Sequence, residues 1–392
     1  MAGVNFTGLN PDLLKAVTDL RQDLHRHPEL AFTENRTAQI VTRHLQGLGL
    51  ELHSGIAKTG VVGVLDFGPG PVVGFRADMD ALPIREMTGM VYASRHAGIM
   101  HACGHDGHTA MLLGAASVLA TRTDLTGRLV FIFQPAEENE GGARVMLEDG
   151  LFTRFPVDRL FALHNMPAVP VGTIMARSGY VSAAFDTFTI TIAGQGGHGA
   201  MPHTACDPTP ASAALVQALN SIVSRNIDPM ASAVVTLGQI SGGASYNVIP
   251  DTMLLKGSCR SLEPSVQKTL KRRIDEICRG TALAWGVDIS CIYEERYPAV
   301  YNEETATAQL HQALSRPDDG FNVISNFDPL MGSEDFAFMA EQVPACYFIL
   351  GNGDTPGPLH SPTYDFNDQA LPVGIQAWVR LAETTLAGTA PS

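Results

Sequence analysis

The chain has 392 residues, which is more than one ordinary domain needs and about right for two. Hydrophobic residues make up 45% and charged residues 17% of the sequence, as is typical of a soluble globular protein with a sizeable core. The formal net charge of −14 disfavours nucleic acid and anionic membrane surfaces as partners, because both attract basic patches.

Targeting signals and disulfides are not expected. The first twenty residues contain no basic segment followed by an apolar one, so they do not predict a signal peptide. The longest nearly apolar stretch, residues 110–120, falls far short of the ~20 residues that span a bilayer. Six cysteines are scattered without a repeated spacing, which indicates no disulfide framework. We therefore expect a cytoplasmic protein without a membrane partner.

The N-terminal part predicts alternating helices and strands. Asn10-Pro11 is a typical helix start, and leucines at helical spacing follow until Pro28. A second helix is expected from Thr33 to about Gly49. Short apolar runs that are typical of buried strands surround a helix expected at 108–119, and they lie at 61–65, 72–75, 129–133 and 161–163. This alternation indicates an α/β layered core.

The middle of the chain has a different pattern. Three threonines alternate with apolar residues over 187–192, which is the period of a half-buried strand. The elements expected after it are a helix at 208–224, strands at 232–240 and 252–260, a helix that begins at Glu263-Pro264 and a strand at 287–293. This β-α-β-β-α-β order is that of a small ferredoxin-like domain.

Beyond residue 297 the α/β pattern returns, with helices expected at 303–315 and 371–387 and a strand at 346–350. We therefore predict a two-domain α/β protein. Residues 1–183 and 297–392 would form a mixed-sheet α/β domain, and residues 184–296 would form the inserted ferredoxin-like domain.

The segment from Met100 to His108 contains three imidazoles, a thiol and a carboxylate. It follows a predicted strand region and precedes a predicted helix, where loops of α/β sheets tend to line the ligand crevice. Thiolate and imidazole groups are strong ligands for zinc and similar divalent metals, which makes Cys103 and His105 candidates. The alternative is a helix N-terminus capped by Asp106, with the histidines facing water.

Two adjacent carboxylates, Glu137 and Glu138, follow the apolar run 129–133. Such a pair at a strand end is costly to bury without a cation. In zinc hydrolases one carboxylate can bind the metal while another activates a water, and this pair suits that division. The alternative is a solvated acidic turn, which Glu140 would extend.

Two further histidines complete the candidate set. His164 ends a predicted strand, and His360 lies in a proline-flanked loop. Each one alone is typical of an ordinary hydrogen-bonded histidine. Like Cys103, His105 and Glu138, however, both fall in the predicted α/β domain, at or just beyond predicted strands. This distribution predicts one convergent metal site.

A Gly-rich loop in the inserted domain, residues 194–203, presents His198 and His203. It lacks both the Lys-Ser/Thr pair and the GxGxxG pattern of phosphate-binding loops, so phosphate binding is not expected. Asn247 fits either a polar contact or a turn.

Nearly the whole chain resembles the M20 metallopeptidase family, in the amidohydrolase branch that contains hippurate hydrolases, N-acyl-amino-acid deacylases and auxin-conjugate hydrolases. The combination of segments is specific, although no single segment is. The segments are DLHRHPEL at 23–30, FRADMDALPI at 75–84, MHACGHDGHTAMLLGAA at 100–116, QPAEE at 134–138, LHNMP at 163–167, GGHGAMPH at 196–203, YNVIP at 246–250, GSEDFAFM at 332–339 and LHSPTYDFND at 359–368.

The resemblance implies a site for two divalent metal ions, with zinc, manganese, cobalt and nickel as candidates. Cys103 would bridge the two ions as a thiolate. Four further residues would complete the coordination shells: His105, Glu138, His164 and His360. Asp78 and Asp80 match a ligand-bearing strand of other branches, and here we expect them to support the ligands instead.

The resemblance also implies roles for the remaining candidates. Glu137 would be the general base and then the proton donor to the leaving amine. The inserted domain would be a lid and dimerisation domain, from which His198 reaches a neighbouring active site. Asn247 and Arg260 match positions that contact substrate. A homodimer or homotetramer is therefore expected.

The implied activity is that of an amidohydrolase that cleaves the amide bond of N-acyl-amino acids such as hippurate, by attack of a hydroxide that bridges the metals. A dipeptidase or carboxypeptidase with the same chemistry is one alternative. A non-catalytic metal- or ligand-binding protein is another, and the presence of Glu137 argues against it. One departure from relatives is Asn139-Glu140, where an extra carboxylate could shift substrate preference.

Overall fold

The computed structural model describes residues 9–138, 141–316, 320–354 and 357–387. Contacts divide the chain into two compact units. The first unit comprises Met1–Gly179, Tyr301–Asp328 and Asp335–Ser392, and the second comprises Tyr180–Val300 and Pro329–Glu334. Each unit has its own hydrophobic core.

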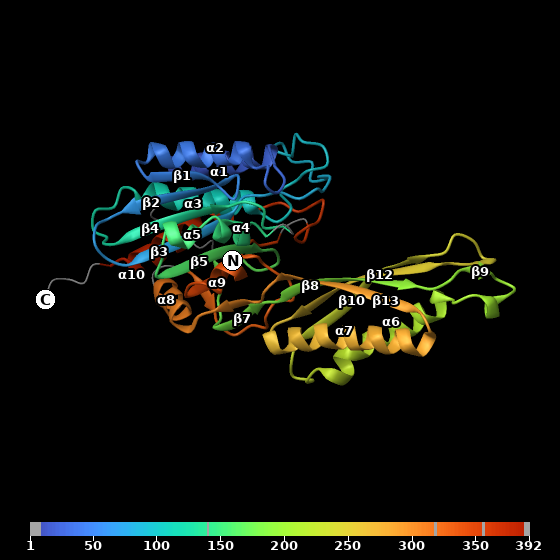
Figure 1. The fold of residues 1–392 in the computed structure, drawn as a ribbon. Helices are drawn as coiled ribbons and strands as arrows, with labels where there is room; N and C mark the ends of the chain where they lie inside the picture. The colour runs from blue at the N-terminus through green and yellow to red at the C-terminus, as the bar shows by residue number, and fades with distance from the viewer. Residues whose placement is uncertain (1–8, 139–140, 317–319, 355–356, 388–392) are drawn as a thin grey trace. The chain divides into compact units, whose positions relative to one another are not determined.

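The first unit is built on an eight-stranded mixed sheet (Figure 1). Its four central strands, β4, β3, β5 and β16, run parallel to one another. In spatial order the strands are β1 (Glu51–Ile56), β2 (Gly60–Asp66), β4 (Arg128–Gln134), β3 (Val72–Asp78), β5 (Arg159–Met166), β16 (Ala345–Gly351), β6 (Thr173–Met175) and β15 (Asn322–Ile324). Because the central strands are buried on both faces, they read as continuous apolar runs.

Helices cover both faces of this sheet. On one face α3 packs against the central strands, with α1, α2 and α10 around it and α8 against β16. On the other face α4 packs against β4 and α9 against β16. The helices are α1 (Pro11–Arg26), α2 (Asn35–Gly47), α3 (His105–Leu119), α4 (Gly142–Glu148), α5 (Leu151–Arg154), α8 (Glu304–Leu314), α9 (Phe336–Ala340) and α10 (Leu371–Thr385), with a 3₁₀ turn at Asp368–Ala370.

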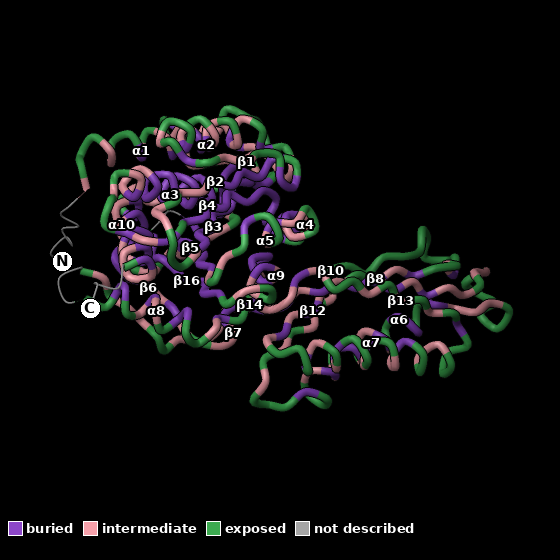
Figure 2. The backbone as a smooth tube through the Cα atoms, turned by 60° about the vertical axis from the view of Figure 1, so that its left-hand side comes forward, coloured by how far each residue is buried: buried purple, intermediate pink, exposed green. Residues whose placement is uncertain are grey.

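Helix α3 begins three residues before the predicted start at residue 108. Gly104 occupies the N-cap position with φ 89°, a conformation that glycine adopts without strain. The helix is buried on nearly all sides, as Figure 2 shows. Close packing explains its glycines: a Cβ at Gly107 would lie 2.4 Å from the Phe366 ring, and one at Gly114 would lie 2.7 Å from Ile375.

The second unit is a four-stranded antiparallel sheet with two helices along one face (Figure 1). Its spatial strand order is β10, β12, β8, β13. Along the chain its main elements follow one another in the predicted β-α-β-β-α-β order. The elements are β8 (Ala184–Ala193), α6 (Pro208–Asn226), β10 (Ala233–Gly242), β12 (Thr252–Ser261), α7 (Pro264–Trp285) and β13 (Asp288–Tyr297), beside a small ribbon of β9 (Gly197–His198) and β11 (Val248–Ile249) and a 3₁₀ turn at Pro202–Thr204.

The predicted fold class is confirmed, since a mixed-sheet α/β unit is joined to an inserted β-α-β-β-α-β unit. The chain passes between the units near β7 (Gly179–Ser182) and β14 (Val300–Asn302). Among the described residues, no helix combines the length and apolar character that crossing a bilayer requires.

Two glycine substitutions test this packing. We expect Gly107→Ala to destabilise the protein by roughly 1–3 kcal/mol, because the added methyl group would collide with the rigid Phe366 ring. Gly280→Ala is the matched control, since this exposed glycine of α7 has open space around it and alanine favours helix. It should stabilise by about 0.5–1 kcal/mol. Urea unfolding followed by circular dichroism measures both, and a neutral or stabilising Gly107→Ala would contradict the packing.

Candidate metal centre

The candidate residues of the first unit gather at one edge of its sheet. The central strands are parallel, so their carboxyl ends lie at the same edge. Asp78 ends β3, His164 lies near the end of β5, and Glu137 and Glu138 follow β4. His360 lies in the loop after β16, where its N–H donates to the carbonyl of Ala102 at 2.8 Å.

Two groups of potential metal ligands share one cysteine. The ligand atoms of Cys103, His105 and His164 all lie within 4.8 Å of one another. Those of Cys103, Glu138 and His360 do as well. The Cys103 thiol is therefore the one member common to both groups, which is the arrangement that a bridging ligand requires.

The donor set fits divalent metal ions. Two tetrahedral zinc ligands, one sulfur and one nitrogen, lie about 3.5 Å apart, and Cys103 Sγ lies 3.4 Å from His164 Nε2. The buried Nε2 of His105 has no hydrogen-bond partner among the described residues. The buried Oε1 of Glu138 lies 3.1 Å from His360 Nε2, yet it has no well-directed hydrogen bond there. Buried polar atoms of this kind require a partner, and a cation supplies one.

The electrostatics of the cluster also favour a cation. Burial alone would lower the pKa of His105, but the carboxylates of Asp78, Asp80 and Glu138 raise it to about 10. Burial, reinforced by nearby carboxylates, raises the pKa of the Cys103 thiol. Where no metal ion is bound, the protonated His105 imidazole therefore balances part of the negative charge. A metal ion bound at His105 would displace that proton and supply the positive charge itself, and a thiolate needs a metal ion in order to form here.

Aspartates at the end of β3 orient the histidines. Asp80 Oδ1 lies 3.2 Å from His105 Nδ1, and its other oxygen accepts the backbone N–H of Glu138 at 2.9 Å. Asp78 Oδ1 lies 2.6 Å from His108 Nδ1. The His108 Nε2 accepts the backbone N–H of Asn165 at 2.9 Å, next to His164. Contacts of this kind fix ring orientation, and they agree with the supporting role expected for Asp78 and Asp80.

Glu137 lies in a constrained turn and is 6% exposed. The backbone N–H of Asp335 donates to its Oε1 at 3.4 Å. The preceding residue, Ala136, has φ 55°, which is uncommon for a residue other than glycine. Its N–H donates to the fully buried Glu34 at 2.9 Å, and Thr59 Oγ1 donates to the same carboxylate at 2.6 Å. Glu34 thus holds the turn that carries Glu137.

A second buried network fixes the first turn of α3. Asp106 Oδ2 lies 2.8 Å from His25 Nδ1 and 3.5 Å from Arg21 Nη1. His25 Nε2 lies 3.3 Å from Glu86. Although burial opposes protonation, Asp106 and Glu86 raise the pKa of His25 to about 9. Asp106 therefore anchors the helix to α1 instead of capping it.

The alternatives that placed these groups in water are wrong. His101, His105 and His108 are at most 1% exposed, and Glu137 is buried. Asn139 and Glu140 lie outside the described residues. The support from Glu34 and from the His25–Asp106 pair was missed, since nothing local in the sequence reveals partners that lie far along the chain. The one available signal was Arg21, a charged residue that falls on the same face of α1 as the apolar residues Val17 and Leu24.

The other candidates lie in the second unit. His198 is exposed on β9, where it pairs with Val248 of β11. The Gly199 N–H donates to the carbonyl of Asn247 at 2.8 Å, so His198 and Asn247 belong to one ribbon. Arg260 lies on β12, and its guanidinium donates to the carbonyl of Met331 at 3.0 Å and to Ser333 Oγ at 3.1 Å.

Removal of the shared ligand tests the cluster. We expect Cys103→Ala to lose most of both metal equivalents, because the thiol belongs to both groups of ligands. His164→Ala, which removes a ligand of one group only, should retain about one equivalent. His96→Ala, an exposed histidine outside the groups, is the control and should bind as the wild type. Metal content is measured by inductively coupled plasma mass spectrometry, and full occupancy in Cys103→Ala would contradict a shared ligand.

The buried Glu34 predicts a pH-dependent stability. Burial, with a smaller effect of Asp80, raises its pKa from 4.5 to about 7. The folded state then holds this proton more tightly than the unfolded state, so stability is lost as pH rises from about 4.5 through 7. Since one pKa unit corresponds to about 1.4 kcal/mol, the loss should approach roughly 3 kcal/mol.

Glu34→Gln keeps an acceptor oxygen but cannot titrate, so it is the reference for this effect. The difference in unfolding free energy between wild type and Glu34→Gln should shift in favour of the variant between pH 5 and 8. Urea unfolding at matched metal content measures it. A difference that is constant over this range would show that Glu34 does not titrate there.

Comparison with known proteins places this geometry in a family. Residues 74–384 match the model of peptidase family M20/M25/M40. The chain is 41% identical to hippurate hydrolase of Campylobacter jejuni over 95% of this chain and 97% of that protein. It is also 41% identical to N-acetyldiaminopimelate deacetylase of Geobacillus thermodenitrificans, over 90% and 93% of the two chains.

A solved structure from Bacillus subtilis, described as a dinuclear metal binding peptidase from the M20 family, superimposes with a TM-score of 0.84. It is 33% identical and is covered over 99% of its length, with 96% of this chain covered. The family match and these full-length similarities agree with the shared-cysteine cluster at the sheet edge. The chain therefore belongs to peptidase family M20/M25/M40.

Proposed function

We propose that this protein is a metal-dependent amidohydrolase that cleaves the amide bond of N-acyl-amino acids, with hippurate-like substrates. The observation that carries the proposal is the buried Glu137 beside two groups of metal ligands that share Cys103. Its similarity to a hippurate hydrolase and to an N-acetyldiaminopimelate deacetylase supports the substrate class.

In this proposal the shared cluster holds two divalent ions, drawn from zinc, manganese, cobalt and nickel. When bound, such ions lower the pKa of water and polarise a carbonyl group. Cys103 would contribute to both coordination shells as a thiolate. The other proposed ligands are His105, Glu138, His164 and His360.

Glu137 would transfer a proton from the attacking water to the leaving group. Its carboxylate would accept a proton from the attacking water and later donate it to the nitrogen of the departing amino acid. The contact from the Asp335 N–H and the strained turn at Ala136 support this role, because they hold the carboxylate in one position. Its burial keeps bulk water from competing for that proton.

The second unit would complete the substrate site. We propose that residues 184–296 act as a lid and dimerisation domain in a homodimer or homotetramer. His198 of this domain would stabilise the charge that develops on the carbonyl oxygen in a neighbouring subunit. The amide of Asn247 and the guanidinium of Arg260 are suited to a substrate carboxylate. A cytoplasmic location is part of the proposal, and the six unpaired cysteines are consistent with it.

Glu137→Gln tests the assignment of the base. We expect its kcat for N-benzoyl-glycine to fall by roughly 10²- to 10⁴-fold, because the amide cannot accept the proton. Metal content should stay unchanged, since Glu137 is not a proposed ligand. Glu341→Gln, an exposed carboxylate of the first unit outside the cluster, is the control and should retain wild-type kcat. A fully active Glu137→Gln would remove Glu137 from the mechanism.

A substrate panel separates this proposal from the peptidase alternative. Metal-loaded protein is assayed for release of free amino acid from N-acetyl, N-benzoyl and long-chain N-acyl amino acids and from unblocked dipeptides. Chelated protein is assayed beside it. Metal-dependent release from N-acyl amino acids supports the proposal, whereas release from dipeptides alone would favour a peptidase.

A further inference from the structure

A cavity of about 460 Å³ in the first unit is lined by residues that lie close in sequence to two proposed metal ligands. Its walls come from the end of β5 and from the loop after β16, and we call it the β5 cavity. Its lining includes Met166, Pro167, Ala168, Asp354, Pro358 and Leu359. The proposed ligand His164 precedes Met166 by two residues, so both side chains face the same side of the strand. The proposed ligand His360 directly follows Leu359.

Backbone hydrogen bonds join the two walls of the β5 cavity. The Ala168 N–H donates to the carbonyl of Gly353 at 3.0 Å, and the Gly353 N–H donates to the carbonyl of Val169 at 2.7 Å. The Asn352 N–H donates to the carbonyl of Met166 at 2.9 Å. Ala168 itself has φ 64°, a conformation that these contacts maintain. The cavity is therefore formed before any ligand binds.

The lining selects one end of an N-acyl-amino acid. Apart from Asp354, its described residues are apolar or glycine, and none of them carries a positive charge. The free carboxylate of the amino acid would be repelled by Asp354 and would find no cation there. The acyl group is uncharged and gains from burial against Met166, Ala168 and Leu359. The volume lies within the range of small-molecule sites and far exceeds what an acetyl group fills.

We propose that the β5 cavity binds the acyl group of the substrate and that it gives the enzyme a preference for aromatic or medium-chain acyl groups over acetyl. This inference rests on the proposed amidohydrolase function. It adds an acyl-binding site and assigns Met166 and Ala168 as specificity-determining residues. Wild-type kcat/KM should be at least about ten-fold higher for N-benzoyl-glycine than for N-acetyl-glycine.

Two substitutions at different positions of the wall formed by the end of β5 fill the β5 cavity. Ala168 is exposed and Met166 is half-buried, so Ala168→Leu and Met166→Trp place added volume in the cavity. Each variant should lower kcat/KM for N-benzoyl-glycine by about ten-fold or more and change that for N-acetyl-glycine by less than about two-fold. A general folding defect would lower both rates together, so the ratio reports the cavity.

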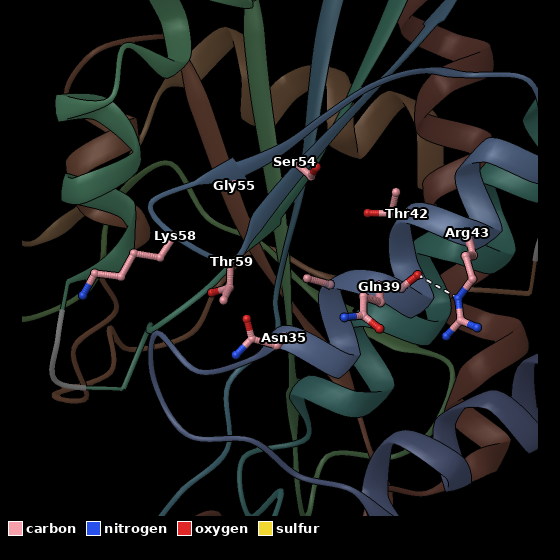
Figure 3. Close-up of a pocket in the computed structure, with 9 residues that line it drawn as sticks. Asn35, Gln39, Thr42, Arg43, Ser54, Gly55, Lys58 and Thr59 are labelled. Atoms are coloured by element: carbon pink, nitrogen blue, oxygen red, sulfur yellow. Dashed lines mark hydrogen bonds between the residues drawn. The ribbon is translucent and has the colours of Figure 1, made fainter.

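A second cavity provides the matched control. This space of about 500 Å³ lies between α2 and the β1–β2 hairpin. Figure 3 shows polar side chains such as Asn35, Gln39 and Thr59 around it. Ala38 also lines it. Ala38→Leu adds the same volume as Ala168→Leu, and it should leave the ratio of the two rates unchanged.

Binding supplies a readout that does not depend on turnover. Metal-loaded Glu137→Gln protein is titrated with N-benzoyl-glycine and N-acetyl-glycine by calorimetry, with and without Ala168→Leu. The tighter binding of the benzoyl compound should disappear when the cavity is filled.

If wild type hydrolyses N-acyl amino acids but both filling variants keep its benzoyl-to-acetyl ratio, the cavity assignment is overturned and the proposed function stands. If wild type releases no amino acid from any N-acyl compound, the proposed function fails, and with it the assignment of an acyl group to this cavity.

Discussion

Repulsion among carboxylates at the carboxyl edge of the sheet is the constraint on which the rest of the first unit depends. Asp78, Asp80 and Glu137 are buried there, and Glu138 is largely so. Negative charges this close are tolerated in a medium of low polarity only beside positive charge. Where no metal ion is bound, protonated His105 supplies part of it, since the neighbouring carboxylates raise its pKa to about 10. Two divalent ions would supply far more, and they would also permit the Cys103 thiol to ionise.

The fold meets this constraint by drawing on distant parts of the chain. Parallel strands bring the ends of β3, β4 and β5 to one edge, and the start of α3 adds Cys103 and His105. Helix α1 then fixes that start through His25 and Asp106. The segment before α2 contributes Glu34, which holds the turn at Ala136. The N-terminal helices thus support the site without supplying a ligand.

Sequence patterns predicted the parts that depend on local chemistry. The apolar runs at 72–75 and 129–133 became β3 and β4, and Asn10 caps α1 with its side chain as expected. The cluster of Cys103, the histidines and Glu138 could be predicted from the sequence. Cysteine, histidine and glutamate are typical metal ligands, and these residues lie at or just beyond predicted strands. Short strands such as β6 and β15 were missed, since three residues carry no periodic signal.

Contacts between residues that lie far apart in the sequence could not be predicted from such patterns. Asp106 looked like a helix cap because its partner, His25, lies 81 residues away in sequence. The role of Glu34 has no local sign in the sequence, because its carboxylate accepts from Ala136, which is 102 residues away. The early start of α3 depends on Gly104, where a Cβ would lie 2.4 Å from the Tyr364 hydroxyl. Each of these features follows from tertiary packing, which overrides local preference.

Backbone strain connects the metal centre to the choice of substrate. Ala136, Ala168 and His360 all have positive φ, and such conformations in residues other than glycine cost about 1–3 kcal/mol each. Each is held by a contact of its backbone N–H, to Glu34, Gly353 and Ala102 respectively. The three strained positions therefore hold the proposed base Glu137, the β5 cavity and the proposed ligand His360 in fixed positions. These positions are held before substrate binds. Differences in kcat/KM between acyl groups therefore depend on how well each group fills the cavity, and not on a rearrangement of the metal centre.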